Sequence, residues 1–275
     1  MLEQLIYKNH VNEVFEFGKD GIFVNTNDLH DYEWTVTKKG NKIASLTYAV
    51  TKRTLPIIII CDTEEKAIAA KNRLLEVAEK DVLAMQHGRI IIGDYYFKCF
   101  VTKSTKKNYL TSKRYMQLTL TLTTDFPFWV KESSLSFTVS NEEDGSGAFL
   151  DYPFDYAFDF YNGMSNQILN NTGFVASNFR MIIFGPCTNP TINIADHAYQ
   201  VNCVIGEGEY LTIDSSSKKI FLTSNDGTVT NKFNSRSRNS YVFEKIPVGE
   251  NVVTWDGDYG FQVILLEERS EPKWT

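Results

Sequence analysis

The chain has 275 residues, a net charge of −6 at pH 7 and four cysteines. The acidic balance argues against non-specific binding to nucleic acids or anionic lipids, since both are polyanions. The length fits two domains or one large β domain, and an aromatic share of 13% favours strands, whose pleated surface accommodates aromatic side chains.

The stretch before the first helix predicts short strands separated by turns. Lys39-Gly40-Asn41 is typical of a turn, and residues 56–61 form an apolar run typical of a buried strand. The longest apolar run, 55–61, is far shorter than a membrane span, and residues 1–7 lack the pattern of a signal peptide. We therefore expect cytoplasmic synthesis and no membrane partner. The earlier strands are expected at 5–7, 22–24, 32–36 and 42–50.

One helix is predicted over residues 62–87. Asp62 is the expected N-cap, with Glu65 closing a capping box three residues later. Gly88 is expected to end the helix in a left-handed conformation. Apolar residues recur at three- and four-residue spacing and predict one buried stripe, made of Ile68, Leu74, Leu75, Ala78 and Val82.

Strands and then a boundary follow the helix. Residues 89–92 and 95–101 predict a hairpin, and 115–123 alternate polar and apolar residues, which indicates one buried face. The stretch 141–147 is polar and contains glycines, as domain linkers do. We therefore expect an N-terminal β domain with one packed helix over 1–135 and a second domain over 136–275.

The second half of the chain predicts an antiparallel β-sandwich. Short strand-like runs alternate with turns and contain no helical pattern, an arrangement typical of sandwiches and jelly rolls. An aromatic run at 152–160 contains Pro153, which restricts it to an edge or a strand start. The expected strands are 179–184, 191–194, 199–205, 209–214, 219–223, 241–246, 251–255 and 261–266.

Nothing in the sequence assembles a catalytic, metal or cofactor site. The four histidines, His10, His30, His87 and His197, have no metallohydrolase spacing, and no nucleophile elbow is present. The four cysteines are scattered without zinc spacing and are expected to be free thiols: Cys61, Cys99, Cys187 and Cys203. We predict that the chain is no enzyme, with no catalytic residues, no bound metal and no cofactor.

Several segments resemble parts of a binding site, but each is better explained as a turn, a loop or a solvated edge. Gly206–Glu209 lacks the lysine of a phosphate loop, and Asp256–Asp258 lacks the closing glutamate of a calcium loop, so both are expected to be turns. The carboxylates of Asp151, Asp155 and Asp159 are expected on a solvated edge. A basic stretch is expected to be a hairpin loop rather than a nucleic-acid site, and consists of Lys103, Lys106, Lys107, Lys113 and Arg114.

The end of the chain has an unusual composition. Residues 261–266 form a strand-like run, a charged cluster follows, and Trp274 lies one residue from the terminus. Because a tryptophan brings a large apolar area, we expect this end to be docked on its own domain or on a neighbouring subunit.

The order of several short motifs resembles the distal tail protein family, called Dit, of siphophages that infect Gram-positive bacteria. The motifs are the helix at 62–85, Gly93-Asp94-Tyr95-Tyr96-Phe97, Tyr152-Pro153-Phe154-Asp155-Tyr156, Asn189-Pro190-Thr191-Ile192, Gly208–Asp214, Phe243–Pro247 and Glu268–Trp274. The resemblance extends over nearly the whole chain.

The resemblance implies a structural virion protein at the phage tail tip. It implies an N-terminal domain, a β-sandwich with a helix, that forms a homohexameric ring, and a galectin-like C-terminal sandwich outside the ring. The implied partners are the major tail tube protein, the tape measure protein, a tail-associated fibre or lysin protein and a possible receptor-binding protein. DNA would only pass through the lumen.

A rival interpretation is a carbohydrate-binding sandwich protein that recognises a receptor at a phage tail. Phe233-Asn234-Ser235-Arg236 is faintly similar to a sugar-binding segment of galectins, but the supporting His and Trp-Glu segment of that site are not recognisable. A third interpretation, an enzyme, has no motif behind it.

Overall fold

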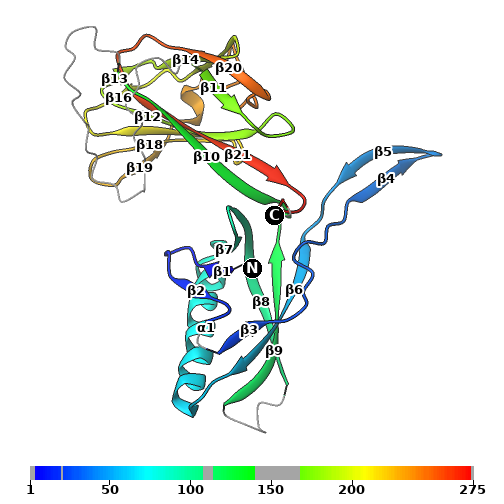
Figure 1. The fold of residues 1–275 in the computed structure, drawn as a ribbon. Coiled ribbons are helices and arrows are strands. Elements are labelled where there is room, and N and C mark those ends of the chain that lie inside the picture. Colours follow the sequence, from blue (N-terminus) through cyan, green and yellow to red (C-terminus); the bar gives the residue numbers. More distant parts are fainter. Residues whose placement is uncertain (1–3, 20, 108–113, 140–167, 274–275) are drawn as a thin grey trace. The chain divides into compact units, whose positions relative to one another are not determined.

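The computed structural model describes residues 4–19, 21–107, 114–139 and 168–273 (Figure 1). The chain divides into two compact units, Met1–Lys131 with Glu268–Thr275, and Glu132–Glu267. The expected linker at 141–147 and the aromatic run at 152–160 lie outside the described residues. The division into independently folding domains at 135 and 136 stays a prediction.

The first unit contains two antiparallel sheets that share one long strand, β8 (Tyr95–Lys107). The beginning of β8 pairs with β7 (Gly88–Ile92) and β10 (Trp129–Phe137), and its end pairs with β9 (Tyr115–Thr124). A register shift between Val101 and Lys103 separates the two pairings. The remaining strands of these sheets are β1 (Leu5–Lys8), β2 (Val14–Glu16), β3 (Ile22–Val24) and β6 (Thr51–Ile60).

The core of this unit follows the alternation expected from the sequence. Leu118, Leu120 and Leu122 of β9 are buried, while the residues between them are partly exposed. The neighbouring strand β6 buries Leu55, Ile57 and Ile59 in the same way. Successive side chains point to opposite faces of a sheet, so this period of two gives each strand one face toward the core.

The helix α1 (Glu64–Ala84) is present, but both of its predicted caps are wrong. Thr63, not Asp62, is the N-cap, and its side chain accepts a hydrogen bond from the Lys66 N–H. The helix ends at Met85, which has the left-handed φ of 51° expected of Gly88. Gly88 instead begins β7.

The predicted buried stripe of α1 is also partly wrong. Leu74 and Ala78 are buried, but Ile68 and Leu75 are 42% and 54% exposed. The buried face consists of Ala67, Ala70, Leu74, Val77, Ala78 and Asp81, and α1 packs on β8 and β2. Three alanines on this face allow the helix backbone to approach the sheet closely. Among the described residues, no helix is long and apolar enough to cross a membrane.

The second unit is built from antiparallel strands around one hydrophobic core, as predicted for this half of the chain. One sheet has the order β19-β18-β17-β12-β21-β10, and another has the order β11-β20-β14-β15. Phe179, Met181 and Ile183 of β12 alternate into the core. The strands are β11 (Ile168–Asn171), β12 (Asn178–Phe184), β13 (Cys187–Thr188), β14 (Thr191–Ile194), β15 (His197–Gln200), β16 (Val204–Ile205), β17 (Tyr210–Asp214), β18 (Lys219–Thr223), β19 (Val229–Asn231), β20 (Gly249–Thr254) and β21 (Phe261–Arg269).

A separate two-stranded sheet is formed by β4 (Thr35–Lys39) and β5 (Lys42–Thr47). Gly40, with a φ of 62°, lies in the turn between them, as the Lys39-Gly40-Asn41 sequence predicts. Figure 1 shows this hairpin as an arm that precedes β6. It pairs with no other described strand.

Candidate assembly surface

The hairpin β4–β5 has one apolar face. Val36 lies opposite Leu46, and Lys38 lies opposite Ile43 beyond a register shift. Cross-strand partners point to the same side of a sheet, so Val36, Leu46 and Ile43 share one face. The pair Thr37 and Ser45 lies on the other face.

This apolar face is exposed to solvent. Val36 is 46% exposed, Leu46 54% and Ile43 64%. An isolated two-stranded hairpin is marginally stable in water and needs a further strand, a helix or another covering surface. An uncovered apolar face on such an element is therefore typical of an interaction site.

Aromatic residues fix the base of the hairpin. The Trp34 and Tyr48 rings meet edge to face with their centroids 6.1 Å apart, directly before β4 and after β5. Both rings also contact Phe128, at centroid distances of 5.9 Å for Trp34 and 4.8 Å for Tyr48. Phe126 extends the cluster, with its ring centroid 5.3 Å from that of Phe128. The rings anchor the hairpin to the loop before β10 while its outer part stays uncovered.

The far end of the hairpin is positively charged. Lys38, Lys39 and Lys42 are exposed, and the hairpin strands contain no acidic residue. Within the described part of the chain these three ammonium groups have no ion pair. The hairpin thus combines an apolar face with a basic tip.

A second exposed apolar surface lies on the outer face of α1. Ile68, Leu75 and Leu83 are 42%, 54% and 79% exposed and recur at spacings of seven and eight residues, which places them along one side of a helix. Glu65, Glu76 and Glu79 lie on the same side and are exposed. These glutamates have no hydrogen bond or ion pair within the described part of the chain.

Two of the four cations of α1, Arg73 and Lys80, bind elsewhere in the unit. Arg73 donates a hydrogen bond of 3.0 Å to the Val14 carbonyl, and Lys80 pairs with Glu13 at 2.5 Å. The Glu13 carboxyl has a lowered pKa, chiefly because it accepts the Lys80 hydrogen bond. Because these two cations are held against β2, they do not neutralise the glutamates of the outer face.

A buried polar network lies beneath α1. The Tyr7 hydroxyl donates to the fully buried Asp81 carboxylate, which also accepts from the His10 backbone N–H at 2.8 Å. The His10 ring nitrogen Nδ1 lies 2.6 Å from the same carboxylate. Burial, and then the hydrogen bond to Asp81, raise the pKa of Tyr7. The network closes the end of the helix onto β1.

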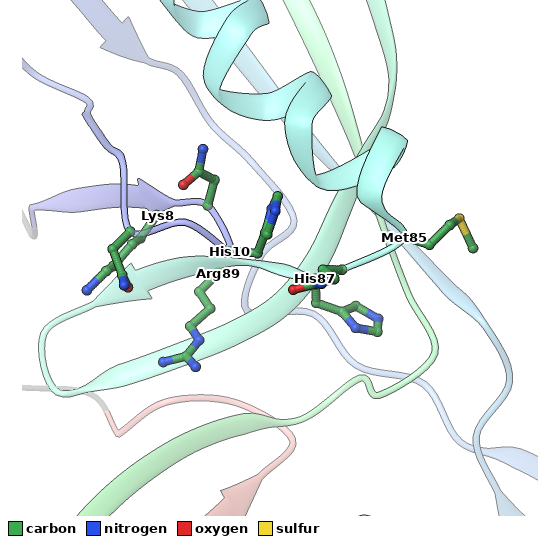
Figure 2. Close-up of a pocket in the computed structure, with 8 residues that line it drawn as sticks. Lys8, His10, Met85, His87 and Arg89 are labelled. Carbon is green, nitrogen blue, oxygen red and sulfur yellow. The ribbon is translucent and has the colours of Figure 1, made fainter. Parts of the chain in front are cut away.

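A polar pocket lies beside this network (Figure 2). It has a volume of about 370 Å³. Its potential cations do not converge, since Figure 2 shows Arg89 and His87 directed away from Lys8 and His10. His87 Nε2 lies 2.9 Å from Asp125, and the Arg89 guanidinium lies over the Tyr96 ring. The pocket is lined by Lys8, Asn9, His10, Asn12, Met85, Gln86, His87 and Arg89.

The other two histidines have structural surroundings. The His30 ring lies against Trp129, with centroids 6.2 Å apart, and the His197 ring lies 2.9 Å from the Tyr241 carbonyl. Among the described residues no group of three His, Cys, Asp or Glu side chains is placed to hold a metal ion. The expectation of no catalytic, metal or cofactor site stays a prediction.

The segments with alternative interpretations are turns or strand ends where they are described. The Gly206 N–H donates to the Glu209 side chain at 2.8 Å inside a turn. Phe233–Ser235 is a short 3-10 helix, and the Arg236 guanidinium stacks 3.9 Å above the Phe233 ring. Lys103, Lys106 and Lys107 lie in β8 and pair with β9, so the hairpin loop expected of the basic stretch is wrong for these three residues. Asp151, Asp155, Asp159, Lys113 and Trp274 lie outside the described residues.

The four cysteines are free thiols, as expected. Cys61 and Cys99 are buried, whereas Cys187 and Cys203 are half-buried. Burial raises the pKa of Cys187 to about 11 and also raises the pKa of Cys203. Such thiols are mostly protonated at neutral pH, and the thiolate is the reactive form.

The fold is that of phage distal tail and baseplate proteins. The chain is similar to the crystal structure of the SPP1 Dit protein, described as a paradigm of the hub adsorption apparatus in Gram-positive infecting phages. The identity is 10%, the TM-score is 0.58, and the match covers 98% of this chain and 100% of that one. It also matches two structures of the phage P2 baseplate in its activated conformation. The one with calcium has 11% identity and a TM-score of 0.64, and the one with strontium has 10% and 0.63. Both cover 99% of this chain and 100% of the other.

No protein-family model and no curated protein matches the sequence. At 10–11% identity the similarity is one of fold. The expected mainly β architecture, and the similarity to Dit on which it was partly based, are confirmed at this level.

Proposed function

We propose that this chain is a structural protein of a phage tail, a distal tail hub of the Dit family. Its N-terminal unit forms a homohexameric ring, and its second, galectin-like unit supports the tail tip. One side of the ring joins the tail tube and tape measure proteins. The other joins a tail-associated fibre or lysin protein and, where present, a receptor-binding protein. DNA passes through a lumen built by six acidic chains.

The observation that carries this proposal is the uncovered apolar face of β4–β5. Val36, Ile43 and Leu46 are 46%, 64% and 54% exposed. They lie on a two-stranded hairpin, an element that needs a covering surface to be stable. In a closed symmetric ring every copy has this face covered by a neighbour, so no copy keeps an uncovered face. The full-length match to hub and baseplate structures supports this interpretation over an enzyme or a lectin.

Native mass spectrometry and electron microscopy of the full chain, at rising concentration, test the proposal. The wild-type chain is expected to form hexameric rings. Leu46→Asp places a charge on the apolar face and should abolish them, whereas Thr37→Asp, on the opposite face of the same hairpin, should not. A chain that forms only dimers, alone and in assembled tails, would refute the hub.

A further inference from the structure

We propose that the apolar face of β4–β5 docks on the outer face of α1 of a second copy of this chain. The inference rests on the proposed hub function and goes beyond it by naming both sides of the contact between subunits. The hairpin side is the apolar face of Val36, Ile43 and Leu46, with Lys38 on the same face and with Lys39 and Lys42 at the tip. The helix side is Ile68, Leu75 and Leu83 with Glu65, Glu76 and Glu79.

The two surfaces are chemically complementary. Each presents three aliphatic side chains between 42% and 79% exposed. The hairpin adds three lysines and no acid, and the helix face adds three glutamates and one lysine, Lys71. Because the nearby cations Arg73 and Lys80 already bind Val14 and Glu13, the glutamates remain available to a partner. Opposite charges around an apolar centre favour this pairing and disfavour hairpin against hairpin.

The helix face is long enough to cover the hairpin. The hairpin strands have five and six residues, and at about 3.3 Å per residue they extend roughly 17–20 Å. Ile68 and Leu83 are fifteen residues apart on α1, which at about 1.5 Å per residue is roughly 22 Å. A helix laid along the hairpin would therefore cover its whole apolar face, and packing on a helix is one of the arrangements that stabilise a hairpin.

The contact is heterologous, since each copy offers a hairpin to one neighbour and a helix to the other. Heterologous contacts produce a ring when the rotation between copies closes, and an open filament when it does not. The docking therefore supplies a head-to-tail contact of the kind that a cyclic hexamer requires.

Reversing the charges on one side at a time tests the pairing. Lys38→Glu with Lys42→Glu makes both surfaces acidic, and Glu76→Lys with Glu79→Lys makes both basic. Each double variant should weaken self-association of the full chain, followed by sedimentation velocity, by about tenfold or more through like-charge contacts. The matched control, Lys103→Glu with Lys107→Glu, changes the charge equally on β8 and should associate like the wild type.

Mixing the two double variants gives the decisive measurement. In an alternating ring every hairpin meets a helix of opposite charge, so the mixture should recover wild-type association, and so should the chain with all four changes. Recovery supports the pairing. Wild-type association by either double variant, or a mixture that does not recover, would overturn the docking while leaving the ring intact. A wild-type chain that never self-associates would overturn the ring as well.

Discussion

The ring of Tyr48 meets the ring of Phe128 almost perpendicularly, at 88°, with a centroid distance of 4.8 Å. Edge-to-face pairs of this kind contribute about 0.5–1.5 kcal/mol beyond the apolar area they bury. The contact joins the end of the β4–β5 hairpin to the loop before β10, so it determines how firmly the hairpin is held for a partner.

Tyr48→Ala should therefore loosen the hairpin more than it destabilises the unit. We expect faster amide hydrogen exchange at residues 35–47 and a loss of about 1 kcal/mol in the free energy of unfolding. Tyr32→Ala removes a tyrosine that is 56% exposed and serves as the control. Unchanged exchange across the hairpin in Tyr48→Ala would show that the aromatic base does not hold it.

The N-cap of α1 is Thr63, whereas the sequence predicted Asp62. The Thr63 side chain accepts the Lys66 N–H at 3.3 Å, whereas the described contact at Asp62 is through its backbone carbonyl, which accepts from Arg114. Thr63→Ala should cost about 1 kcal/mol of stability, and Asp62→Ala should be close to neutral. Urea unfolding of both variants checks this, and equal losses would contradict the assignment.

The sequence predicts the strands of this chain better than it predicts which surfaces are covered. Leu118, Leu120 and Leu122 were placed correctly because a strand with one buried face repeats every two residues. The helix was also placed correctly, but Ile68 and Leu75 were expected in the core. Apolar residues line both sides of α1, and periodicity alone does not say which side the chain itself covers.

The same limit explains why the candidate assembly surface was missed. The sequence indicated strands on both sides of Gly40, and the alternation of Trp34 with Val36 and of Leu46 with Tyr48 was the available signal. That alternation predicts one apolar face. The surface that would cover this face lies outside the hairpin, so the hairpin's own sequence does not reveal it. Only the strand pairing shows that no other described strand provides it.

Gly88 was misassigned for a different reason, which leads to another prediction. It was expected to end the helix, yet its role is close packing, because an added Cβ would collide with the Asp81 carboxylate and the Tyr7 hydroxyl. Gly88→Ala should destabilise the first unit by about 1–3 kcal/mol, as overpacked cores do.

A double-mutant cycle identifies the cause of that loss. Tyr7→Phe removes the hydroxyl that meets the new methyl group, so the combination with Gly88→Ala should cost less than the sum of the two single changes. Thermal unfolding of the four chains gives the coupling energy. Simple additivity would mean that the cost of the new methyl group comes from Asp81 or from the backbone rather than from the Tyr7 hydroxyl.

Buried tyrosines should make the protein sensitive to alkali. Burial is the main cause that raises the pKa of Tyr7, Tyr199 and Tyr259 above the ordinary value of 10.0. In the unfolded chain these phenols lose protons near pH 10, whereas in the folded chain they keep them. The unfolded state therefore binds fewer protons, and stability, fully present below pH 10, falls as the pH rises above it.

Each such tyrosine should contribute a loss of about 1.4 kcal/mol per pH unit above pH 10. Tyr199 donates a hydrogen bond of 2.9 Å to the Glu244 carbonyl, so Tyr199→Phe should lower stability by about 1 kcal/mol at pH 8 yet flatten the decline above pH 10. Tyr32→Phe, at an exposed position, should leave the slope unchanged. Urea unfolding between pH 8 and pH 11.5 measures all three chains, and an equal slope in Tyr199→Phe and the wild type would show that Tyr199 ionises as readily in the folded chain as in the unfolded one.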